Sequence, residues 1–326
     1  MKRSIHLISM LSLAAAAVAM AREAPAADVQ QIDLAEWTPP SIGSVGDDPF
    51  GKLVKYGYAL FTDTPNQIGP AAIDPAKRFV GGGLTCQNCH LKAGTQPYSV
   101  PLMGAWGQFP QYRAREAQID TLEDRINGCF ERSMNGHVIP LDGTEMKAYL
   151  AYIKWLSTGI PDGAKLIGAG MKSIKEPGRA ADLDNGAKVF ADTCASCHGK
   201  DGRGQRAGKG PGYQFPPLAG PDSYNNGAGM TRVLTFASFV RYNMPFGTTF
   251  DAPVLSDTDA YDVAAYVNSL ERPVRPNLDK DFPNKLQKPV DTPYGPYADD
   301  FPPEQHKYGP FDPIRAKIKE LAAARR

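Results

Sequence analysis

Apolar side chains recur at helical spacing in two pairs of segments, one pair in each half of the chain. In the first half, an aromatic and aliphatic run over residues 50–61 precedes a second periodic segment over residues 146–156. In the second half, a shorter run over residues 185–190 precedes one over residues 262–270. Apolar positions three and four residues apart are typical of helices with one buried face. The pattern therefore predicts the same pair of helices twice.

Polar residues at the ends of these segments support the predicted helices. Ser256 is a suitable N-cap with acidic residues in the turn that follows, and Pro273 stops this helix. In the first half, an Asp-Gly-Thr-Glu segment at residues 142–145 opens the corresponding helix, and Gly159 and Pro161 end it.

Segments rich in Gly and Pro separate and follow the two halves. Residues 163–181 predict a linker, and residues 200–230 predict a loop. Residues 272–313 are rich in Pro but too aromatic for a disordered tail. We expect these residues to form an extended segment that packs over the domains, followed by a short helix over residues 314–324.

The N-terminus has the pattern of an export signal. Two basic residues precede an apolar run over residues 5–20, and small-residue cleavage sites follow near residues 21–27. An uncleaved membrane anchor is the alternative, but the run is short for a span and polar residues interrupt it. We predict a signal peptide over residues 1–27, location in the periplasm and no stable membrane insertion.

Charge and chain length change this picture little. The 326 residues suffice for two modest domains, and removal of Lys2 and Arg3 takes the formal net charge from +1 to −1. A near-neutral balance argues against a nucleic-acid partner. Any attraction for an anion must therefore come from a local group of cations.

Four of the five cysteines lie in two motifs of identical spacing, each Cys-x-x-Cys-His. The residues are Cys86, Cys89 and His90 in the first half and Cys194, Cys197 and His198 in the second. In an exported chain, two thiols followed directly by His are typical of a covalently bound c-type haem, with the His as proximal iron ligand. A zinc site is the weaker alternative, because each cysteine pair is followed directly by His.

The order of helix, motif, loops and helix is that of the small all-α cytochrome c domain. We therefore predict an all-α protein with two cytochrome c-like domains, each around one covalently bound haem. The first domain spans residues 28–165 and the second spans residues 166–272. Residues 273–326 form a Pro- and aromatic-rich C-terminal extension, the strap.

Each haem iron has one further ligand position. For the second haem, Met244 is the first candidate because it precedes Pro on a loop just ahead of the last helix, and Met230 is the second. Methionine ligation raises the haem potential. For the first haem, the candidates are Cys129, Met103, Met134 and His137.

Cys129 lies on a helix predicted between Asp120 and Asn135. On that helix Arg125, Cys129, Arg132 and Ser133 share one face. Two guanidinium groups beside a thiol would lower its pKa and favour metal ligation, so we expect Cys129 to be the distal ligand of the first iron. The alternative is a buried free cysteine that only fills the core.

Four arginines lie within twenty residues of the first half. Arg113 and Arg115 precede the helix that carries Arg125 and Arg132. Guanidinium groups suit a small oxyanion because they donate paired hydrogen bonds in a fixed plane. The alternative is pairing with haem propionates or neighbouring carboxylates, and we expect at least one of the four to do so.

At this point the sequence resembles the dihaem thiosulfate dehydrogenases, periplasmic cytochromes c that form tetrathionate. The resemblance is carried by the run Arg-Ile-Asn-Gly-Cys-Phe-Glu-Arg-Ser-Met-Asn-Gly at residues 125–136. Residues 109–115, the first haem motif and the Gly-Pro-Tyr to Gly-Pro-Phe segment at residues 295–311 contribute to it. It extends over nearly all of the mature chain.

This resemblance implies roles for single residues. In the family, the thiol matching Cys129 is the distal ligand of the active-site haem, and thiosulfate binds among groups matching Arg115, Arg125 and Ser133. The second haem passes electrons to a small periplasmic cytochrome c or similar redox protein. Some members carry Lys before the distal Met and exchange the two ligands. This chain has Asn243 there, so we expect no such exchange.

The implied reaction joins two thiosulfate ions into tetrathionate with release of two electrons, and the same site could run in reverse. The Cys129 sulfur could leave the iron and carry a thiosulfate sulfur as an S-sulfonate-type adduct. Thiolate ligation predicts a low-potential first haem that feeds a higher-potential second haem. Two rival functions are a dihaem electron carrier without its own substrate and a sulfur-oxidation cytochrome that transfers thiosulfate to a carrier-protein cysteine.

Overall fold

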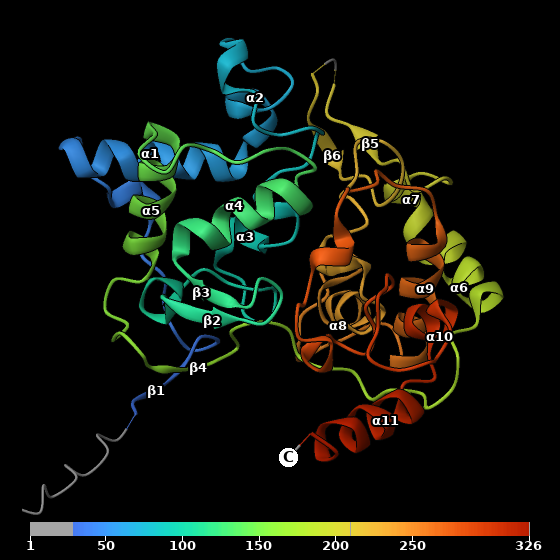
Figure 1. The fold of residues 1–326 in the computed structure, drawn as a ribbon. Coiled ribbons are helices and arrows are strands. Elements are labelled where there is room, and N and C mark those ends of the chain that lie inside the picture. The colour runs from blue at the N-terminus through green and yellow to red at the C-terminus, as the bar shows by residue number, and fades with distance from the viewer. Residues whose placement is uncertain (1–28, 209, 326) are drawn as a thin grey trace, which may run out of the picture.

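The computed structural model describes residues 29–208 and 210–325. The predicted signal peptide therefore lies outside the described residues. The described residues form two helical lobes that lie side by side (Figure 1). Within the described ranges, no helix has the length and apolar character needed to cross a membrane. Buried apolar side chains of both lobes, among them Val54, Tyr152 and Phe236, form one continuous core.

The first lobe is built on two crossing helices. Its helices are α1 (Pro49–Thr62), α2 (Thr64–Ile68), α3 (Leu91–Gly94), α4 (Leu122–Arg132) and α5 (Thr144–Leu156). Helix α1 packs on α5, and a Cβ atom on Gly57 of α1 would overlap the carbonyl oxygen of Ala148 on α5. The absence of a side chain at Gly57 therefore permits the close crossing.

The second lobe repeats this arrangement. Its helices are α6 (Leu183–Val189), a π-helical turn (Phe190–Cys194), α7 (Ala195–His198), α8 (Val233–Asn243) and α9 (Asp257–Ser269). Gly186 on α6 meets the carbonyl oxygen of Asp262 on α9, just as Gly57 meets Ala148. The structure confirms the prediction of one helix pair used twice.

Side chains cap two of the helices, and the cap of α9 is the predicted one. Thr121 caps α4, because its hydroxyl accepts from the Asp124 backbone N–H at 3.3 Å and its own N–H donates to the Asp124 carboxylate at 2.9 Å. Ser256 caps α9 and accepts from the Asp259 N–H at 3.0 Å.

Three small strand pairs were not predicted. They are β1 (Gln31–Asp33) parallel to β4 (Lys165–Ile167), β2 (Gln111–Arg113) antiparallel to β3 (Gln118–Asp120), and β5 (Gln205–Arg206) antiparallel to β6 (Tyr213–Phe215). The last pair lies within residues 200–230, which were expected to be loop. The β2–β3 hairpin carries Arg113 at the end of β2 and Arg115 in its turn, and it leads directly into α4, so it places both arginines beside that helix.

Short 3-10 turns connect these elements. They are η1 (Ile42–Ser44), η2 (Pro75–Lys77), η3 (Cys86–Asn88), η4 (Ala105–Gln108), η6 (Gly229–Thr231), η7 (Leu278–Lys280) and η8 (Lys285–Gln287).

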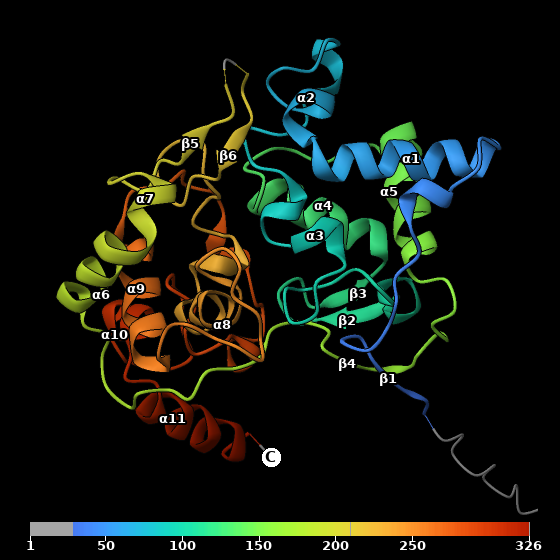
Figure 2. The same cartoon turned by 180° about the vertical axis from the view of Figure 1, so that it is seen from behind.

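The strap packs against both lobes, as Figure 2 shows from behind. Phe282 donates its backbone N–H to Arg115 of the first lobe at 2.7 Å, and the Tyr308 carbonyl accepts from the Tyr261 hydroxyl of α9 at 2.7 Å. The strap contains a helix that was not predicted, α10 (Pro303–Tyr308), and ends in the expected helix α11 (Asp312–Ala323).

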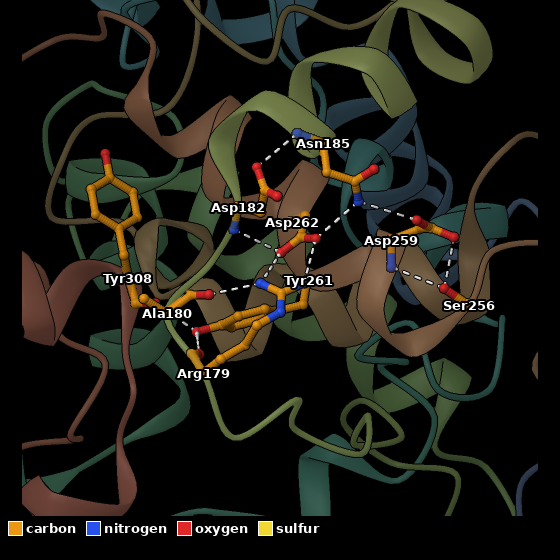
Figure 3. A network of polar contacts seen from close by, with 9 residues as sticks. All are labelled: Arg179, Ala180, Asp182, Asn185, Ser256, Asp259, Tyr261, Asp262 and Tyr308. Carbon is orange, nitrogen blue, oxygen red and sulfur yellow. Dashed lines mark hydrogen bonds and ion pairs between the residues drawn. The ribbon is translucent and has the colours of Figure 1, made fainter.

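A buried carboxylate ties the linker to the second lobe (Figure 3). Asp262 of α9 accepts two hydrogen bonds from Arg179, at 2.9 and 2.7 Å, and one from the Asn185 side chain at 2.9 Å. The backbone N–H of Asp182 donates to it as well, at 2.9 Å. Because all of these donors surround one buried carboxylate, they hold the linker at the crossing of α6 and α9.

Candidate active site between the lobes

The two histidines of the Cys-x-x-Cys-His motifs are held in the same way. His90 Nδ1 lies 2.5 Å from the carbonyl oxygen of Val100, and His198 Nδ1 lies 2.8 Å from that of Pro216. A ring whose Nδ1–H donates to a carbonyl presents Nε2 as the free iron ligand. Both motifs therefore fit a c-type haem with His as the proximal ligand.

A cavity opens above the first motif. Cys86, Cys89 and His90 line one side, Cys129 and Ser133 line the other, and most of the remaining lining is apolar. Its empty volume is about 1090 Å³, counted with the solvent at its mouth. The cavity borders both cysteines and the histidine of the motif, which is where a covalently bound haem would lie.

The structure sorts the candidate ligands of the first iron. Met103 is buried in a separate apolar cluster with Leu34 and Ile160, and His137 is exposed beside Phe79. Cys129 and Met134 both line the cavity. Of the four candidates for the distal ligand of the first iron, only Cys129 and Met134 thus lie in the same cavity as the proximal histidine.

Arg125 and His90 act directly on Cys129. The i, i+4 spacing on α4 places Arg125 one turn before Cys129, and its Nη1 donates to Cys129 Sγ at 3.0 Å. Burial raises the pKa of the Cys129 thiol, but the charge of Arg125 and a hydrogen bond with His90 outweigh it and hold this pKa at about 6. The thiol therefore faces the proximal histidine and is poised to ionise.

Arg132 does not lie beside the thiol, contrary to the prediction. Its Nη1 and Nη2 donate to the two carboxylate oxygens of Asp281 at 2.9 and 2.7 Å, and both side chains are only 9% exposed. Helical spacing placed Arg132 near the face of Cys129, but the buried carboxylate of the strap draws the long side chain away. Ser133, by contrast, lines the cavity together with Arg125 and Cys129.

A second, outer cavity shares Arg125 with the first and has an empty volume of about 1180 Å³, counted in the same way. The four predicted arginines line this outer cavity, and so do the carboxylate-bearing residues Glu116, Asp120, Asp124 and Glu131. A fifth arginine, Arg275, comes from the strap and pairs with Glu131 at 3.3 Å. No local signal could have found Arg275, because it lies far along the chain from the helix that it contacts.

Two arginines of the outer cavity have no protein acceptor for their guanidinium groups among the described residues: Arg113 and Arg115. Burial and Arg125 lower the pKa of Arg113, and burial and Arg132 lower that of Arg115. Half-buried guanidinium groups without a carboxylate partner favour a bound anion. At least one arginine was expected to pair with a haem propionate or a neighbouring carboxylate; Arg132 pairs instead with Asp281 of the strap.

The candidate ligands of the second iron lie in different places. Met244 follows directly on α8 and is half-buried at the edge of the core. Met230 lines the first cavity together with Tyr224. Of the two, Met244 remains the predicted distal ligand.

The chain matches two protein-family models. The model described as "SoxA/TsdA, cytochrome c domain" matches residues 78–161, and the model described as "Cytochrome c" matches residues 183–271. Each matched region contains one Cys-x-x-Cys-His motif, so the chain carries two covalently bound c-type haems.

Curated relatives match most of the chain. The "Thiosulfate dehydrogenase" of Stutzerimonas stutzeri is 39% identical over 280 residues, which cover 83% of this chain and 87% of the relative. That of Thiomonas intermedia is 39% identical over 272 residues, or 82% of each chain. Among solved structures, thiosulfate dehydrogenase (TsdBA) from Marichromatium purpuratum in its as-isolated form matches with a TM-score of 0.68 and 38% identity. That match covers 74% of this chain but only 51% of the solved chain, so this chain spans about half of it.

Proposed function

Because this chain belongs to the thiosulfate dehydrogenase family, we propose that it oxidises two thiosulfate ions to tetrathionate in the periplasm. Each thiosulfate loses one electron, and the two sulfane sulfurs join in an S–S bond, so 2 S₂O₃²⁻ become S₄O₆²⁻ and two electrons. The two haems supply single-electron acceptors, the first at the substrate and the second toward an acceptor protein. That acceptor is a small cytochrome c or a similar redox protein.

The observation that carries this proposal is the position of Cys129. Its sulfur lies in one cavity with His90, and a guanidinium nitrogen of Arg125 donates to it at 3.0 Å. A thiolate opposite the proximal histidine suits the distal ligand of the first haem, and an electron carrier without a substrate needs no such group. Released from the iron, the same sulfur could hold a thiosulfate sulfur.

Arg115, Arg125 and Ser133 would reduce the electrostatic repulsion between the two thiosulfate ions. Two dianions must approach until their sulfane sulfurs touch, and their charges repel. Arg125 lines both the first cavity, above the first haem motif, and the outer cavity. Ser133 lines the first cavity and Arg115 lines the outer cavity. Fixed cationic donors in a partly dry site offset the charge and orient the ions.

The second lobe completes the electron path. His198 is the proposed proximal ligand of the second iron and Met244 the distal ligand, which raises the potential of that haem above that of a thiolate-ligated first haem. Electrons would then pass from the first lobe to the second. Asn243 precedes Met244, so no lysine competes for this ligand position.

Replacement of the thiol tests the proposal. We expect Cys129→Ala to lower the rate of tetrathionate formation at least about 100-fold, since loss of groups around a metal already costs 10–100-fold. The first haem should also lose the spectrum of a thiolate-ligated iron. Met134→Leu changes another sulfur in the same cavity and should keep both rate and spectrum. Full activity with unchanged spectra in Cys129→Ala would exclude the mechanism.

Haem reduction by thiosulfate and product analysis of the wild-type protein distinguish the rival functions. An electron carrier stays oxidised when thiosulfate is added to the oxidised protein, whereas the dehydrogenase reduces its haems. A transferase consumes thiosulfate only with a carrier-protein cysteine, so free tetrathionate as the main product excludes it.

A further inference from the structure

Two adjacent residues of the strap contact two different arginines of the outer cavity. Asp281 binds Arg132 of α4, and Phe282 contacts Arg115, which follows the β2 strand. The strap is therefore part of the wall around the proposed substrate site, although it lies more than 140 residues further along the chain.

Asp281 neutralises the charge of Arg132 in a bidentate ion pair. Its two oxygens close a bidentate pair with Nη1 and Nη2 of Arg132, and one of them also accepts from the Tyr294 hydroxyl at 2.6 Å. The carbonyl oxygen of Gly227 takes a further hydrogen bond from Arg132 Nη1 at 3.3 Å. Three of the five N–H donors of Arg132 are thus engaged, and its ion pair with Asp281 has no net charge, so it attracts an anion less than an unpaired arginine would.

Phe282 holds Arg115 without using its donors. The guanidinium carbon of Arg115 lies 5.5 Å from the centre of the Phe282 ring, and the Phe282 N–H donates to the Arg115 carbonyl at 2.7 Å. A cation–π contact fixes the position of a guanidinium through its face and leaves the N–H groups at its edge free. Arg115 consequently keeps its donors for a ligand.

The backbone of Phe282 points to a requirement for this ring. Phe282 has φ of +53°, in the left-handed region that a bulky side chain rarely adopts, and it is 4% exposed. Such a conformation persists where the surrounding structure enforces it, and it is frequent at ligand sites.

We propose that Asp281 and Phe282 are positioning residues that give the two arginines opposite roles. Asp281 neutralises Arg132, and Phe282 presents Arg115 to the thiosulfate anion with free donors. The inference rests on the proposed function and adds the strap to its substrate site.

Phe282→Leu tests the second half of this proposal. It keeps an apolar side chain but removes the aromatic face, and we expect KM for thiosulfate to rise about tenfold with kcat within twofold of wild type. The assay is tetrathionate formation with excess artificial oxidant, and haem spectra should not change. Phe282→Trp restores the ring and should restore KM. Phe311→Leu alters another buried strap aromatic and should leave KM unchanged.

A double-mutant cycle distinguishes positioning from loss of structure. In an Arg115→Gln background, Phe282→Leu should have no further effect on KM, because the guanidinium that the ring holds is gone. If the two effects add, or if Phe282→Leu leaves KM at the wild-type value, the role of Phe282 is wrong. If Phe282→Leu does not fold, Phe282→Trp with wild-type KM supports the proposal and with raised KM overturns it.

Asp281→Asn tests the first half. The variant leaves the charge of Arg132 without a carboxylate partner beside the outer cavity, so sulfate, a dianion that does not react, should inhibit it about tenfold more strongly than wild type. The double variant Arg132→Gln/Asp281→Asn removes the free cation, so sulfate should inhibit it as weakly as it inhibits wild type. Asp281→Glu keeps the carboxylate and should also show the wild-type sulfate inhibition. Unchanged sulfate inhibition in folded Asp281→Asn would overturn the proposal. If Asp281→Asn does not fold, wild-type inhibition in the double variant supports the proposal, and stronger inhibition there overturns it.

Failure of the proposed function gives a different result from failure of this inference. A wild-type protein that forms no tetrathionate contradicts the function itself. An active wild type with unaltered variants contradicts only the roles of Asp281 and Phe282.

Discussion

Burial acts on two ionisable side chains of this protein with different outcomes. At Cys129, burial raises the thiol pKa, but Arg125 and His90 reverse the effect. At Lys288 in the strap, burial and the charge of Lys285 lower the ammonium pKa to about 8, and the opposing charge of Asp281 is too weak to restore it. Asp281 is already engaged by Arg132, so Lys288 lies instead against the rings of Tyr294 and Tyr297.

The pH dependence of stability should reveal this lysine. Its folded pKa of about 8 lies below the ordinary 10.5, so between these values the unfolded chain holds a proton that the folded protein has released. Stability from this group therefore rises as pH rises through that window and is constant below it. We expect the free energy of unfolding of wild type, minus that of Lys288→Met, to increase from pH 8 to pH 10 in denaturant titrations.

An exposed lysine provides the control. Lys52 lies on the surface of α1, so Lys52→Met measured alongside shows what the loss of an exposed lysine does to the same titration. A flat difference for Lys288→Met would show that Lys288 is not perturbed by burial.

At the scale of elements, the crossings of α1 with α5 and of α6 with α9 depend on glycine. Alanine at Gly57 or Gly186 would place a methyl group on a backbone carbonyl of the partner helix. Gly128 of α4 has open space around it. Alanine substitutions at these three positions therefore distinguish the effect of crowding at a helix crossing from the effect of helix propensity on stability.

We expect Gly57→Ala and Gly186→Ala each to lower the free energy of unfolding by about 1–3 kcal/mol, because the packed backbones cannot yield. Gly128→Ala should raise it by up to about 1 kcal/mol, since alanine is the better helix former. Chemical denaturation of the three variants measures the difference. Equal effects at Gly57 and Gly128 would mean that the close approach is unimportant.

These elements also show what the sequence could and could not predict. Local spacing placed the helix pairs, the cap at Ser256 and the contact of Arg125 with Cys129, because each depends on residues within a few positions. The pairing of Arg132 with Asp281 depends on residues 149 positions apart. Helical periodicity assigns a residue to a face, but it does not reveal which distant group competes for a long side chain.

At the scale of the whole molecule, the two lobes share one core, and polar groups connect them near the proposed distal ligand of the second haem. Asn243 is 3% exposed, accepts from Gln96 Nε2 of the first lobe at 2.7 Å and donates to the Tyr98 carbonyl at 3.3 Å. It also donates to the Phe239 carbonyl within α8 at 3.1 Å. Asn243 thus serves as a connection between the lobes.

We therefore expect the lobes to unfold together in the wild type, with coincident thermal transitions in far-ultraviolet and haem-region circular dichroism. Asn243→Ala leaves Gln96 and the Tyr98 carbonyl without partners and should lower the free energy of unfolding by about 1–3 kcal/mol. Asn66→Ala removes an exposed contact to Asp63 and should have little effect. Because the lost contacts join the lobes, the two transitions of Asn243→Ala should also separate. If they separate already in the wild type, the shared core does not couple the lobes, and electron transfer between the haems then depends on a loosely held interface.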